Sequence, residues 1–428
     1  MKANSEAATL LHELIRINTT NPTHVERPAA EWVATKLDEV GIASQIIESA
    51  PGRASTIARI EGTDRSRPAL LIQGHLDVVP AESGEWSVDP FAGEIHDGFV
   101  WGRGAVDMKD MDAMVLTVLR HWAREGRKPP RDLVVAFLAD EEMGSAQGAH
   151  FLIEHHPELF VDCTEAIGEV GGFSVSLNEQ ARLYLVQTAE KGIAWLRLVA
   201  TGTPGHGSML QPDNVVTRLA SAVSRIGDHQ FPVVVRPEMA TLLKALEPIV
   251  GAELDPLKSE EWLPHLGGIA RMIGACLRNT ANPTRFDAGY LHNVVPSRAE
   301  AVIDARFLPG HEEELMADIT RLAGDGIDVE VFVRGDAVET EFECSLVDAM
   351  CAALRAEDPG AIPVPYMLTG GTDAKAFSRL GIQCFGFSPL LLPANLDFSA
   401  LFHGIDERVP IDALEFGVRV LDRFLTSC

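Results

Sequence analysis

The chain has 428 residues, of which 46% are hydrophobic, so it is long enough to bury a large core and to form more than one domain. Its 62 acidic residues against 36 basic ones give a formal net charge of −26, which argues against binding to nucleic acid or to an anionic membrane surface. An anionic substrate would therefore need a local positive centre, which bound metal ions could supply.

The six cysteines are scattered along the chain and include no Cys-x-x-Cys pair. This distribution predicts reduced thiols rather than a disulfide framework or a structural zinc site. The first residues lack the apolar core of a signal peptide and predict an amphipathic helix, and no apolar run is long enough to span a bilayer. We therefore expect a cytoplasmic protein.

Hydrophobic periodicity predicts helices and strands in alternation through the first part of the chain. The predicted helices cover residues 6–17, 28–40, 110–125 and 146–154. The predicted strands cover residues 55–62, 69–74, 132–140 and 165–170. This alternation indicates an α/β sheet with helices on both faces.

The pattern changes after about residue 186. Strands are predicted at residues 193–202, 285–291, 299–307 and 329–333, and helices at residues 214–226, 239–277 and 312–322. Without the helical insertion at 239–277, the order is β-α-β-β-α-β, a compact two-layer unit. A helix at 344–355 and a strand near 382–387 then resume the earlier pattern.

The sequence therefore predicts a mixed-sheet α/β domain with helices on both faces, interrupted by an inserted α+β domain. We expect residues 1–186 and 335–428 to form the α/β domain. Residues 187–334 would form the inserted domain.

Polar side chains follow several predicted strands, at the edge where sites form in open α/β sheets. His75 and Asp77 follow the strand ALLIQG, Glu141 and Glu142 follow DLVVAFLAD, and Glu169 ends EAIGE. Each residue alone has an ordinary structural interpretation, such as a solvated helix start for the two adjacent glutamates. Their convergence on one edge is harder to explain in that way.

Two further stretches carry residues of the same types. Asp107 lies in the Gly-flexed loop WGRGAVDMKD, where it could also be a helix N-cap, and His403 lies in LFHGIDERVP. Carboxylates crowded in a cleft repel one another unless something positive lies between them. Histidine, aspartate and glutamate are a suitable ligand set for zinc or a similar divalent ion.

Five ordered motifs, GHLDVVP, GRGAVDMK, ADEEMGS, IGE and FHGIDE, give the chain a clear resemblance. It resembles the di-zinc metallopeptidase and amidohydrolase family of glutamate carboxypeptidase, aminoacylase, succinyl-diaminopimelate desuccinylase and acetylornithine deacetylase. The resemblance covers nearly the whole chain, and it implies that the first domain is catalytic and the inserted one is a lid and dimerisation domain. It also implies two divalent metal ions per subunit, zinc by default, with cobalt and manganese as alternatives.

The resemblance implies metal ligands residue by residue. His75 and Glu169 would bind the first ion, Glu142 and His403 the second, and Asp107 would bridge the two. We expect the peptide bond after Asp107 to be cis, as it is in the family.

The resemblance also implies catalytic roles beside the metals. Asp77 would hydrogen-bond the imidazole of His75 and set its tautomer. Glu141 would be the general base that activates a metal-bridging water and passes its proton to the leaving nitrogen. His206, in TGTPGHGSM, would reach into the neighbouring subunit's site and stabilise the oxyanion, which implies a homodimer formed through the lid.

Substrate contacts are implied for four further residues. Asn293 in HNVVPS and Arg306 in DARFLPG would bind the substrate, and the guanidinium of Arg306 suits a carboxylate. Gly371 and Thr372, in LTGGTDAKAF, match a loop whose backbone amides meet that carboxylate. An ordinary strand-to-helix turn would use similar residues.

The chain departs from the family pattern in two places. Asp110 and Met111 stand where the family often has two glycines after DMK, and we still expect a helix to start there. The second departure is the helical insertion at 239–277. Its apolar residues either pack the core of the lid, the interpretation that helical spacing favours, or line a pocket for an apolar substrate side chain. These residues are Leu242, Leu243, Leu246, Trp262, Leu263 and Met272.

The predicted function is a metal-dependent amidohydrolase of aminoacylase or carboxypeptidase type, which cleaves the amide of an N-acyl amino acid or small peptide with a free carboxylate. The stretch WSVDPFAGEIHDGFVWGRG resembles the aminoacylase and carboxypeptidase branch.

One alternative is a hydrolase of another C–N bond on a carboxylate-bearing small molecule. A second is a non-catalytic protein that binds amino-acid conjugates, against which the full set of presumed ligands argues. A serine hydrolase or a thermolysin-like enzyme would need the GxSxG or HExxH motif, and both are absent.

Overall fold

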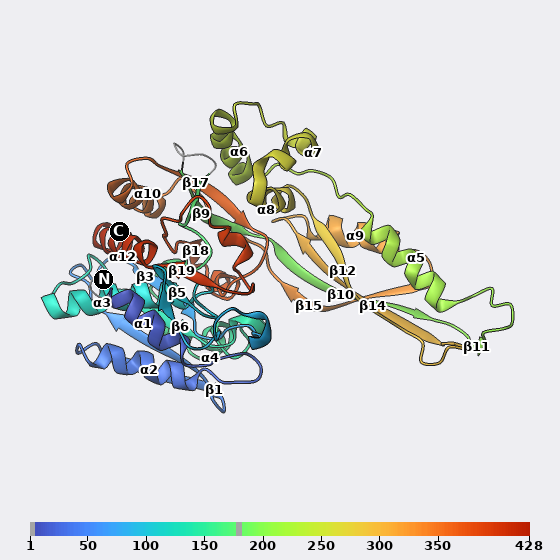
Figure 1. Cartoon of the computed structure of the whole chain (residues 1–428), viewed down its shortest axis with the longest axis horizontal. Coiled ribbons are helices and arrows are strands. Elements are labelled where there is room, and N and C mark those ends of the chain that lie inside the picture. The colour runs from blue at the N-terminus through green and yellow to red at the C-terminus, as the bar shows by residue number, and fades with distance from the viewer. Residues whose placement is uncertain (1–4, 177–181) are drawn as a thin grey trace.

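The computed structural model describes residues 5–176 and 182–428. An elongated arm projects from a larger body (Figure 1). The body is built on a ten-stranded sheet and the arm on a four-stranded one. The chain passes from the large sheet to the small one after Glu190 and returns at Val338.

The large sheet has the strand order β1-β2-β6-β3-β7-β18-β9-β16, and β8 and β17 also pair with β9. Its centre is parallel, where β3 pairs with β6 and β7, and its edge at β1 is antiparallel. Its strands are β1 (Ser44–Ala50), β2 (Arg53–Ile60), β3 (Ala69–His75), β6 (Leu133–Leu138), β7 (Cys163–Gly168), β8 (Ser174–Ser176), β9 (Arg182–Glu190), β16 (Val338–Glu339), β17 (Ala361–Leu368) and β18 (Gln383–Gly386).

Helices cover both faces of this sheet. On β6, the side chains of Leu133, Val135 and Phe137 join the apolar cluster of one face, and those that alternate with them join the cluster of the other. Both sets are buried, which explains why β6 is a continuous apolar run rather than an alternating one. The helices of the body are α1 (Glu6–Ile15), α2 (Arg27–Asp38), α3 (Lys109–Glu125), α4 (Ala149–His155), α10 (Ser345–Glu357), α11 (Ala374–Phe377) and α12 (Ile411–Ser427).

The arm has the predicted β-α-β-β-α-β order. Its strands are β10 (Gly192–Thr201), β12 (Thr280–Ala288), β14 (Arg298–Phe307) and β15 (Ile327–Gly335), arranged β12-β14-β10-β15 and all antiparallel. Two helices, α5 (Val215–Gly227) and α9 (Glu312–Ala323), pack on one face of this sheet. The predicted fold class, a mixed-sheet α/β domain interrupted by an α+β domain, is confirmed.

The helical insertion forms α6 (Pro237–Val250), α7 (Ser259–Trp262) and α8 (Ala270–Cys276). We expected its apolar side chains to pack the core of the arm, and this expectation is wrong. Leu242, Leu243 and Leu246 are buried in the same cluster as the core of the body, and α6 packs against β17. Because α5 and α9 already fill the covered face of the small sheet, the apolar stripe of α6 is buried against the large sheet instead. The side chain of Met272 lies outside the described residues.

Short elements complete the fold. β4 (Ile95–His96), β5 (Phe99–Trp101) and β19 (Arg408–Pro410) form a three-stranded sheet, and β11 (Gly205–His206) pairs with β13 (Val294–Val295) at the tip of the arm. The short 3₁₀ helices are Ser83–Glu85, Glu141–Met143, Pro157–Leu159, Pro256–Lys258, Leu263–Ile269, Ser378–Leu380 and Phe398–Ala400. Across residues 5–176 and 182–428, none of the helices has the length and apolar character needed to cross a membrane.

Candidate active site

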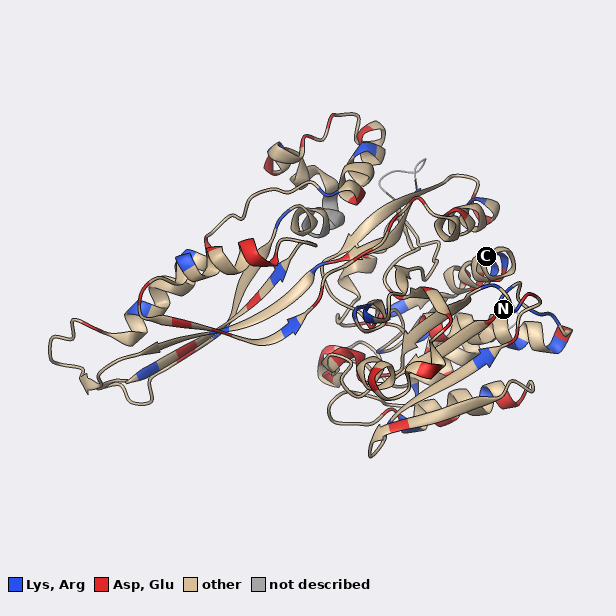
Figure 2. Cartoon of the chain, turned by 180° about the vertical axis from the view of Figure 1, so that it is seen from behind, with Lys and Arg blue, Asp and Glu red and all other residues tan. Residues whose placement is uncertain are grey.

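Three neighbouring strands bring the predicted polar residues to one edge of the large sheet. β3 ends at His75, β6 leads into the 3₁₀ helix that begins at Glu141, and β7 ends one residue before Glu169. β3 pairs in parallel with both β6 and β7, so the carboxyl ends of all three strands meet. Figure 2 marks the Asp and Glu positions of the chain in red on the ribbon, and they occur in both the body and the arm.

Two groups of potential metal ligands lie at this edge. One contains His75, Asp107 and Glu169, the other contains Asp107, Glu142 and His403, and the ligand atoms within each group lie within 4.8 Å of one another. Asp107 belongs to both groups. Its Oδ1 lies 3.2 Å from His75 Nε2 and its Oδ2 lies 3.2 Å from His403 Nε2. Its two oxygens therefore face different groups.

A buried ion pair holds the loop that carries Asp107. The carboxylate of Glu407 accepts hydrogen bonds from the backbone N–H groups of Val106, at 2.7 Å, and Asp107, at 3.2 Å. Arg103 donates to the other oxygen of Glu407 at 2.6 Å. The peptide bond between Asp107 and Met108 is cis, as expected.

Asp77 contacts His75, but mainly through its backbone. His75 Nδ1 lies 2.9 Å from the carbonyl oxygen of Asp77 and 3.6 Å from its carboxylate. The carboxylate instead accepts hydrogen bonds from the backbone N–H groups of Glu141 and Glu142, at 3.0 and 3.1 Å. Asp77 therefore orients both adjacent glutamates as well as the imidazole.

The buried polar network that contacts the carboxylate of Asp77 was not predicted from the sequence. Asn21 donates to the carboxylates of Asp77 and Asp140, at 3.0 Å each. Asp140 also pairs with Arg53, which lies 2.9 Å from Glu26. The only local signal was the Asn-Pro dipeptide at Asn21, which is typical of ordinary turns.

The electrostatics of the site suit cations. Burial raises the pKa of Glu141 well above its ordinary value, and the charge of Glu169 adds to the shift. Burial also raises the pKa of Glu169 to about 8, and burial together with Asp107 raises the pKa of Glu142. Hydrogen bonds to Asp107 and Glu142 raise the pKa of His403 to about 10. Divalent ions held at this edge would offset both the burial and the mutual repulsion of the carboxylates.

One buried atom points to the same conclusion. Glu142 Oε1 is buried and has no hydrogen-bond partner within the described part of the chain. A buried carboxylate oxygen without a partner is costly, and a divalent ion would satisfy it. The donor set, imidazole nitrogens with carboxylate oxygens, is the one that zinc and similar ions take.

Two predicted residues lie far from this edge. His206, in β11, is exposed at the far tip of the arm (Figure 1). The carbonyl oxygen of Asn293 accepts a hydrogen bond from the N–H of Gly207 at 2.8 Å, so Asn293 lies at the same tip. Within one chain, neither residue joins the metal-ligand groups.

The remaining predicted residues lie near the junction of arm and body. Asp304 accepts hydrogen bonds from Nε and Nη2 of Arg306, at 2.6 and 3.1 Å. The N–H and hydroxyl of Thr372 donate to the buried carboxylate of Glu190, at 3.2 and 2.6 Å. The amide of Thr372 is therefore directed at Glu190 rather than at the metal ligands, and Gly371 precedes it in the same loop.

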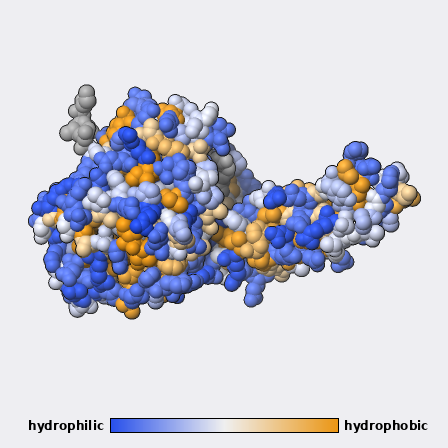
Figure 3. Space-filling view, turned by 90° about the horizontal axis from the view of Figure 1, so that it is seen from below, coloured by the Kyte–Doolittle hydropathy of each residue, from blue (hydrophilic) through white to orange (hydrophobic). Residues whose placement is uncertain are grey.

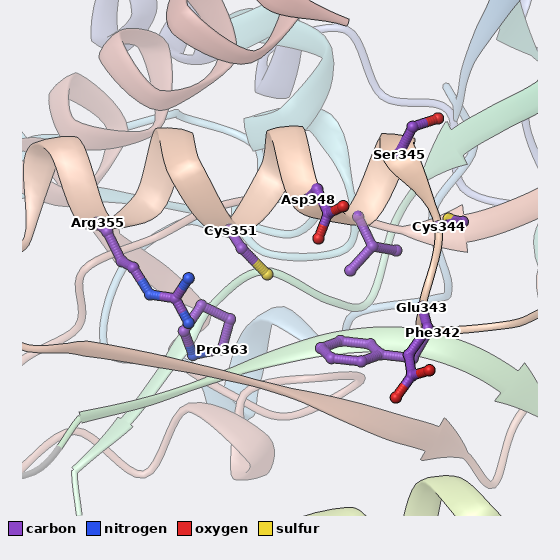
Figure 4. A pocket seen from close by; sticks show the side chains of 9 residues that line it. Phe342, Glu343, Cys344, Ser345, Asp348, Cys351, Arg355 and Pro363 are labelled. Carbon is purple, nitrogen blue, oxygen red and sulfur yellow. The ribbon is translucent and has the colours of Figure 1, made fainter.

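A separate cavity of about 430 Å³ lies beside α10, between this helix and β17 (Figure 4). Phe342, Asp348, Cys351 and Arg355 are among its lining residues. None of the predicted site residues lines it, so we do not assign the chemistry to this cavity.

Comparison with known proteins places these motifs in a family. The model of peptidase family M20/M25/M40 matches residues 71–427. The chain is 27% identical over 439 residues to the N-fatty-acyl-amino acid synthase/hydrolase PM20D1 of Xenopus tropicalis, covering 98% of this chain and 85% of the relative. It is also 27% identical over 430 residues to aminoacylase-1 of Sus scrofa, covering 98% of this chain and 95% of the relative.

Solved structures show the same fold. The M20 family metallo-carboxypeptidase Sso-CP2 from Sulfolobus solfataricus matches with a TM-score of 0.75 at 19% identity, over 99% of both chains. Human carnosine dipeptidase 1 matches with a TM-score of 0.70 at 16% identity, over 99% of this chain and 95% of that one. The match of the family model over most of the chain confirms the resemblance: this chain is a hydrolase that belongs to peptidase family M20/M25/M40.

Proposed function

We propose that this chain is a metal-dependent amidohydrolase that cleaves the amide bond of an N-acyl amino acid or small peptide with a free carboxylate. The observation that carries the proposal is the position of Asp107 between two ligand groups, with Glu141 beside them. The similarity to aminoacylase-1 and to PM20D1 supports N-acyl amino acids as the substrate class.

We infer that the two groups hold two divalent ions, zinc by default, with cobalt or manganese as alternatives. His75 and Glu169 would bind one ion, Glu142 and His403 the other, and Asp107 would bridge them. When bound, such a pair lowers the pKa of a water molecule and polarises the scissile carbonyl. The ions would also give the acidic chain the local positive centre that an anionic substrate needs.

Glu141 is the proposed general base. Its Oε2 lies 4.0 Å from His75 Nε2, on the side of the first ligand group. It would take a proton from the attacking water and deliver it to the amide nitrogen, which then leaves as an amine. Asp77 would support this step, because its carboxylate holds the backbone of Glu141 and the turn around it.

Substrate binding would involve residues from both parts of the chain. We assign Arg306 to the substrate carboxylate, which would compete with Asp304 for the guanidinium. Gly371 and Thr372 would line the same end of the substrate. Asn293 and His206 would contact the amide, with His206 stabilising the oxyanion.

Because His206 and Asn293 lie at the tip of the arm, we infer a homodimer in which each arm tip completes the partner subunit's site. Residues 187–334 would then be the lid and dimerisation domain, and residues 1–186 and 335–428 the catalytic domain. The two passages between the sheets, after Glu190 and before Val338, lie close to both boundaries and support this division. The absence of disulfides among the six cysteines agrees with a cytoplasmic enzyme.

The first test is a substrate panel. Zinc-loaded protein would be incubated with N-acyl amino acids, dipeptides and N-succinyl amines, and the released amines followed by mass spectrometry. We expect cleavage by the wild type and a loss of at least about 10³-fold in Glu141→Gln, with two metals per subunit in both proteins. Near-normal rates in Glu141→Gln would disprove the assigned base. No amide cleavage by a protein with two bound metals would disprove the proposed reaction.

The homodimer has its own test. Mixing inactive Glu141→Gln with inactive His206→Ala, after dissociation and reassembly, should restore about one quarter of the wild-type rate. Half of the random dimers are mixed, and half of the sites in those dimers hold both intact residues. Absence of any recovery would show that His206 does not act across a subunit boundary.

A further inference from the structure

The sheet of the arm has an open face, opposite α5 and α9, and this face carries an apolar patch beside the body. Trp195 on β10 stands opposite Asp304 on β14 and Val333 on β15. Trp195 and Val333 are each 38% exposed, and Phe332 is 43% exposed. Figure 3 views the molecule from this side and shows hydrophobic side chains gathered on the arm where it meets the body. We call Ile193, Trp195, Phe332 and Val333 the arm patch.

A β-bulge builds the patch. Trp195 pairs with Val333 and Leu196 pairs with Val331, so Phe332 is an extra residue on β15. The rings of Trp195 and Phe332 lie 6.3 Å apart with a tilt of 47°. Without the bulge, Phe332 and Val333 would point to opposite faces of the sheet. With it, both join Trp195 on the open face.

The apolar surface ends abruptly along the arm. The next residue of β10 on the open face is Arg197, whose guanidinium lies 5.1 Å above the ring of Phe332. Arg197 also lies 3.6 Å from Glu300 and 3.4 Å from Glu330, so the outer part of the face is covered by ion pairs. A long protein-docking surface would extend apolar contacts along the arm, whereas this patch is confined to a few residues beside the body.

The patch adjoins the residues assigned to the substrate carboxylate. Ile193 stands opposite Arg306, two pairs closer to the body than Trp195 and Asp304. A Cβ placed on Gly371 would lie 3.2 Å from Ile193 Cδ1. Arg306, Gly371 and the arm patch therefore form one continuous surface at the junction of arm and body.

We propose that the arm patch, with Trp195 at its centre, is the specificity subsite for the apolar side chain of the amino acid that carries the substrate carboxylate. The inference rests on the proposed function. An amino acid bears its carboxylate and its side chain on one carbon atom, so the side chain must lie next to Arg306. Residues two apart on a strand are separated by roughly 7 Å, so an apolar side chain beside a carboxylate bound at Arg306 would extend towards Trp195. The acyl group lies on the other side of the scissile bond and would not meet Trp195.

The test compares substrates that vary in one part only. N-acetyl-phenylalanine, N-acetyl-leucine and N-acetyl-alanine vary the amino acid, and N-octanoyl-alanine varies the acyl group. For Trp195→Ala we expect kcat/KM to fall about tenfold or more for phenylalanine and leucine, mainly through KM. The two alanine substrates should stay within about twofold of the wild type, and Trp195→Phe should recover most of the loss.

The control variant is Phe286→Ala, which removes an aromatic ring of the same 43% exposure as Phe332 from the distal part of the same sheet. It should leave all four substrates within about twofold of the wild type. Equal losses in Trp195→Ala for all substrates, or a loss that follows the octanoyl chain, would overturn the proposal.

Direct binding separates this inference from the proposed function. Calorimetric titration of zinc-loaded Glu141→Gln with N-acetyl-phenylalanine and N-acetyl-alanine measures recognition without turnover. Adding Trp195→Ala to this variant should weaken binding of the phenylalanine compound alone, about tenfold. If no amide is hydrolysed but Trp195→Ala weakens binding of the phenylalanine compound alone, the proposed reaction is wrong and the proposed subsite is supported. If Trp195→Ala leaves both dissociation constants unchanged, the subsite is wrong even when hydrolysis is observed.

Discussion

The carboxylate of Asp77 accepts a hydrogen bond from the backbone N–H of Glu141, at 3.0 Å. This bond joins the end of β3 to the turn after β6, and Asn21 supports it by donating to the second oxygen of Asp77. Asp77 also receives the N–H of Glu142, so one buried carboxylate positions the proposed base and a proposed ligand together. Its influence on the site therefore reaches beyond the imidazole of His75.

Replacing Asp77 by Asn should loosen the metal site. The asparagine side chain would keep one acceptor oxygen. Its NH₂ group, however, would face a backbone N–H that in the wild type donates to a carboxylate oxygen. We expect metal affinity to fall about 10–100-fold, as is typical when the support of metal ligands is removed. Chelator competition followed by metal analysis measures this loss. Asp97→Asn, at a highly exposed position, is the control, and equal affinities in the two variants would contradict the role of Asp77.

Replacing Glu407 by Gln should destabilise the fold strongly. The change leaves the buried guanidinium of Arg103 without its charged partner and weakens the support of the Asp107 loop. Breaking a buried ion pair costs about 3–5 kcal/mol. Glu330→Gln removes one of the two acidic partners of Arg197, in an exposed pair, and should cost about 1 kcal/mol or less. Urea unfolding compares the two variants, and similar midpoints would refute the prediction.

Leu246→Ala tests whether the helical insertion is part of the core of the body. Leu246 is fully buried in that core, so the substitution should lower the free energy of unfolding by about 2–5 kcal/mol. Leu257 lies in the same insertion but is 77% exposed, and Leu257→Ala should change stability by about 0.5 kcal/mol or less. Thermal and urea unfolding give the comparison. A small effect of Leu246→Ala would mean that the insertion folds apart from the body.

Glu6 should make stability depend on pH in the acid range. Its hydrogen bond to Arg124, with a further contribution from Arg120, lowers the pKa of Glu6 from 4.5 to about 2. A carboxyl group with a lowered pKa stabilises the fold at pH values above 4.5, and this contribution is lost as the pH falls towards 2. Glu6→Gln should therefore be less stable than the wild type at pH 7, by about 1 kcal/mol or less because the group is partly exposed. The difference should shrink between pH 4.5 and pH 3 in urea titrations, and a constant difference would contradict the assignment.

Much of the fold could be predicted because its signals are local. The helix that begins near Lys109 and the strand at β6 both follow from apolar spacing, and both are confirmed. Asp110, in the first turn of that helix, is buried rather than solvated, which spacing alone did not indicate. β9 and β17 were missed, since their residues alternate too weakly to separate a buried strand from a loop.

The site, like the fold, could be predicted in part from local sequence. The sequence by itself determined which residues could bind metal, because His75, Asp107, Glu142, Glu169 and His403 stand in ordered motifs at strand ends and loops. The sequence also determined the α/β class, through periodicities that depend only on near neighbours. The motifs and the periodicities both depend on short stretches of chain, where backbone geometry determines which side chains share a face.

Only the tertiary structure decided how distant segments meet. Asn21 reaches Asp77 and Asp140, α6 is buried against β17 instead of the arm, and a bulge at Phe332 completes the patch around Trp195. Each of these contacts joins residues far apart in the sequence. Their partners depend on which apolar faces are already covered and on how strands register, and neither property is encoded within one local stretch.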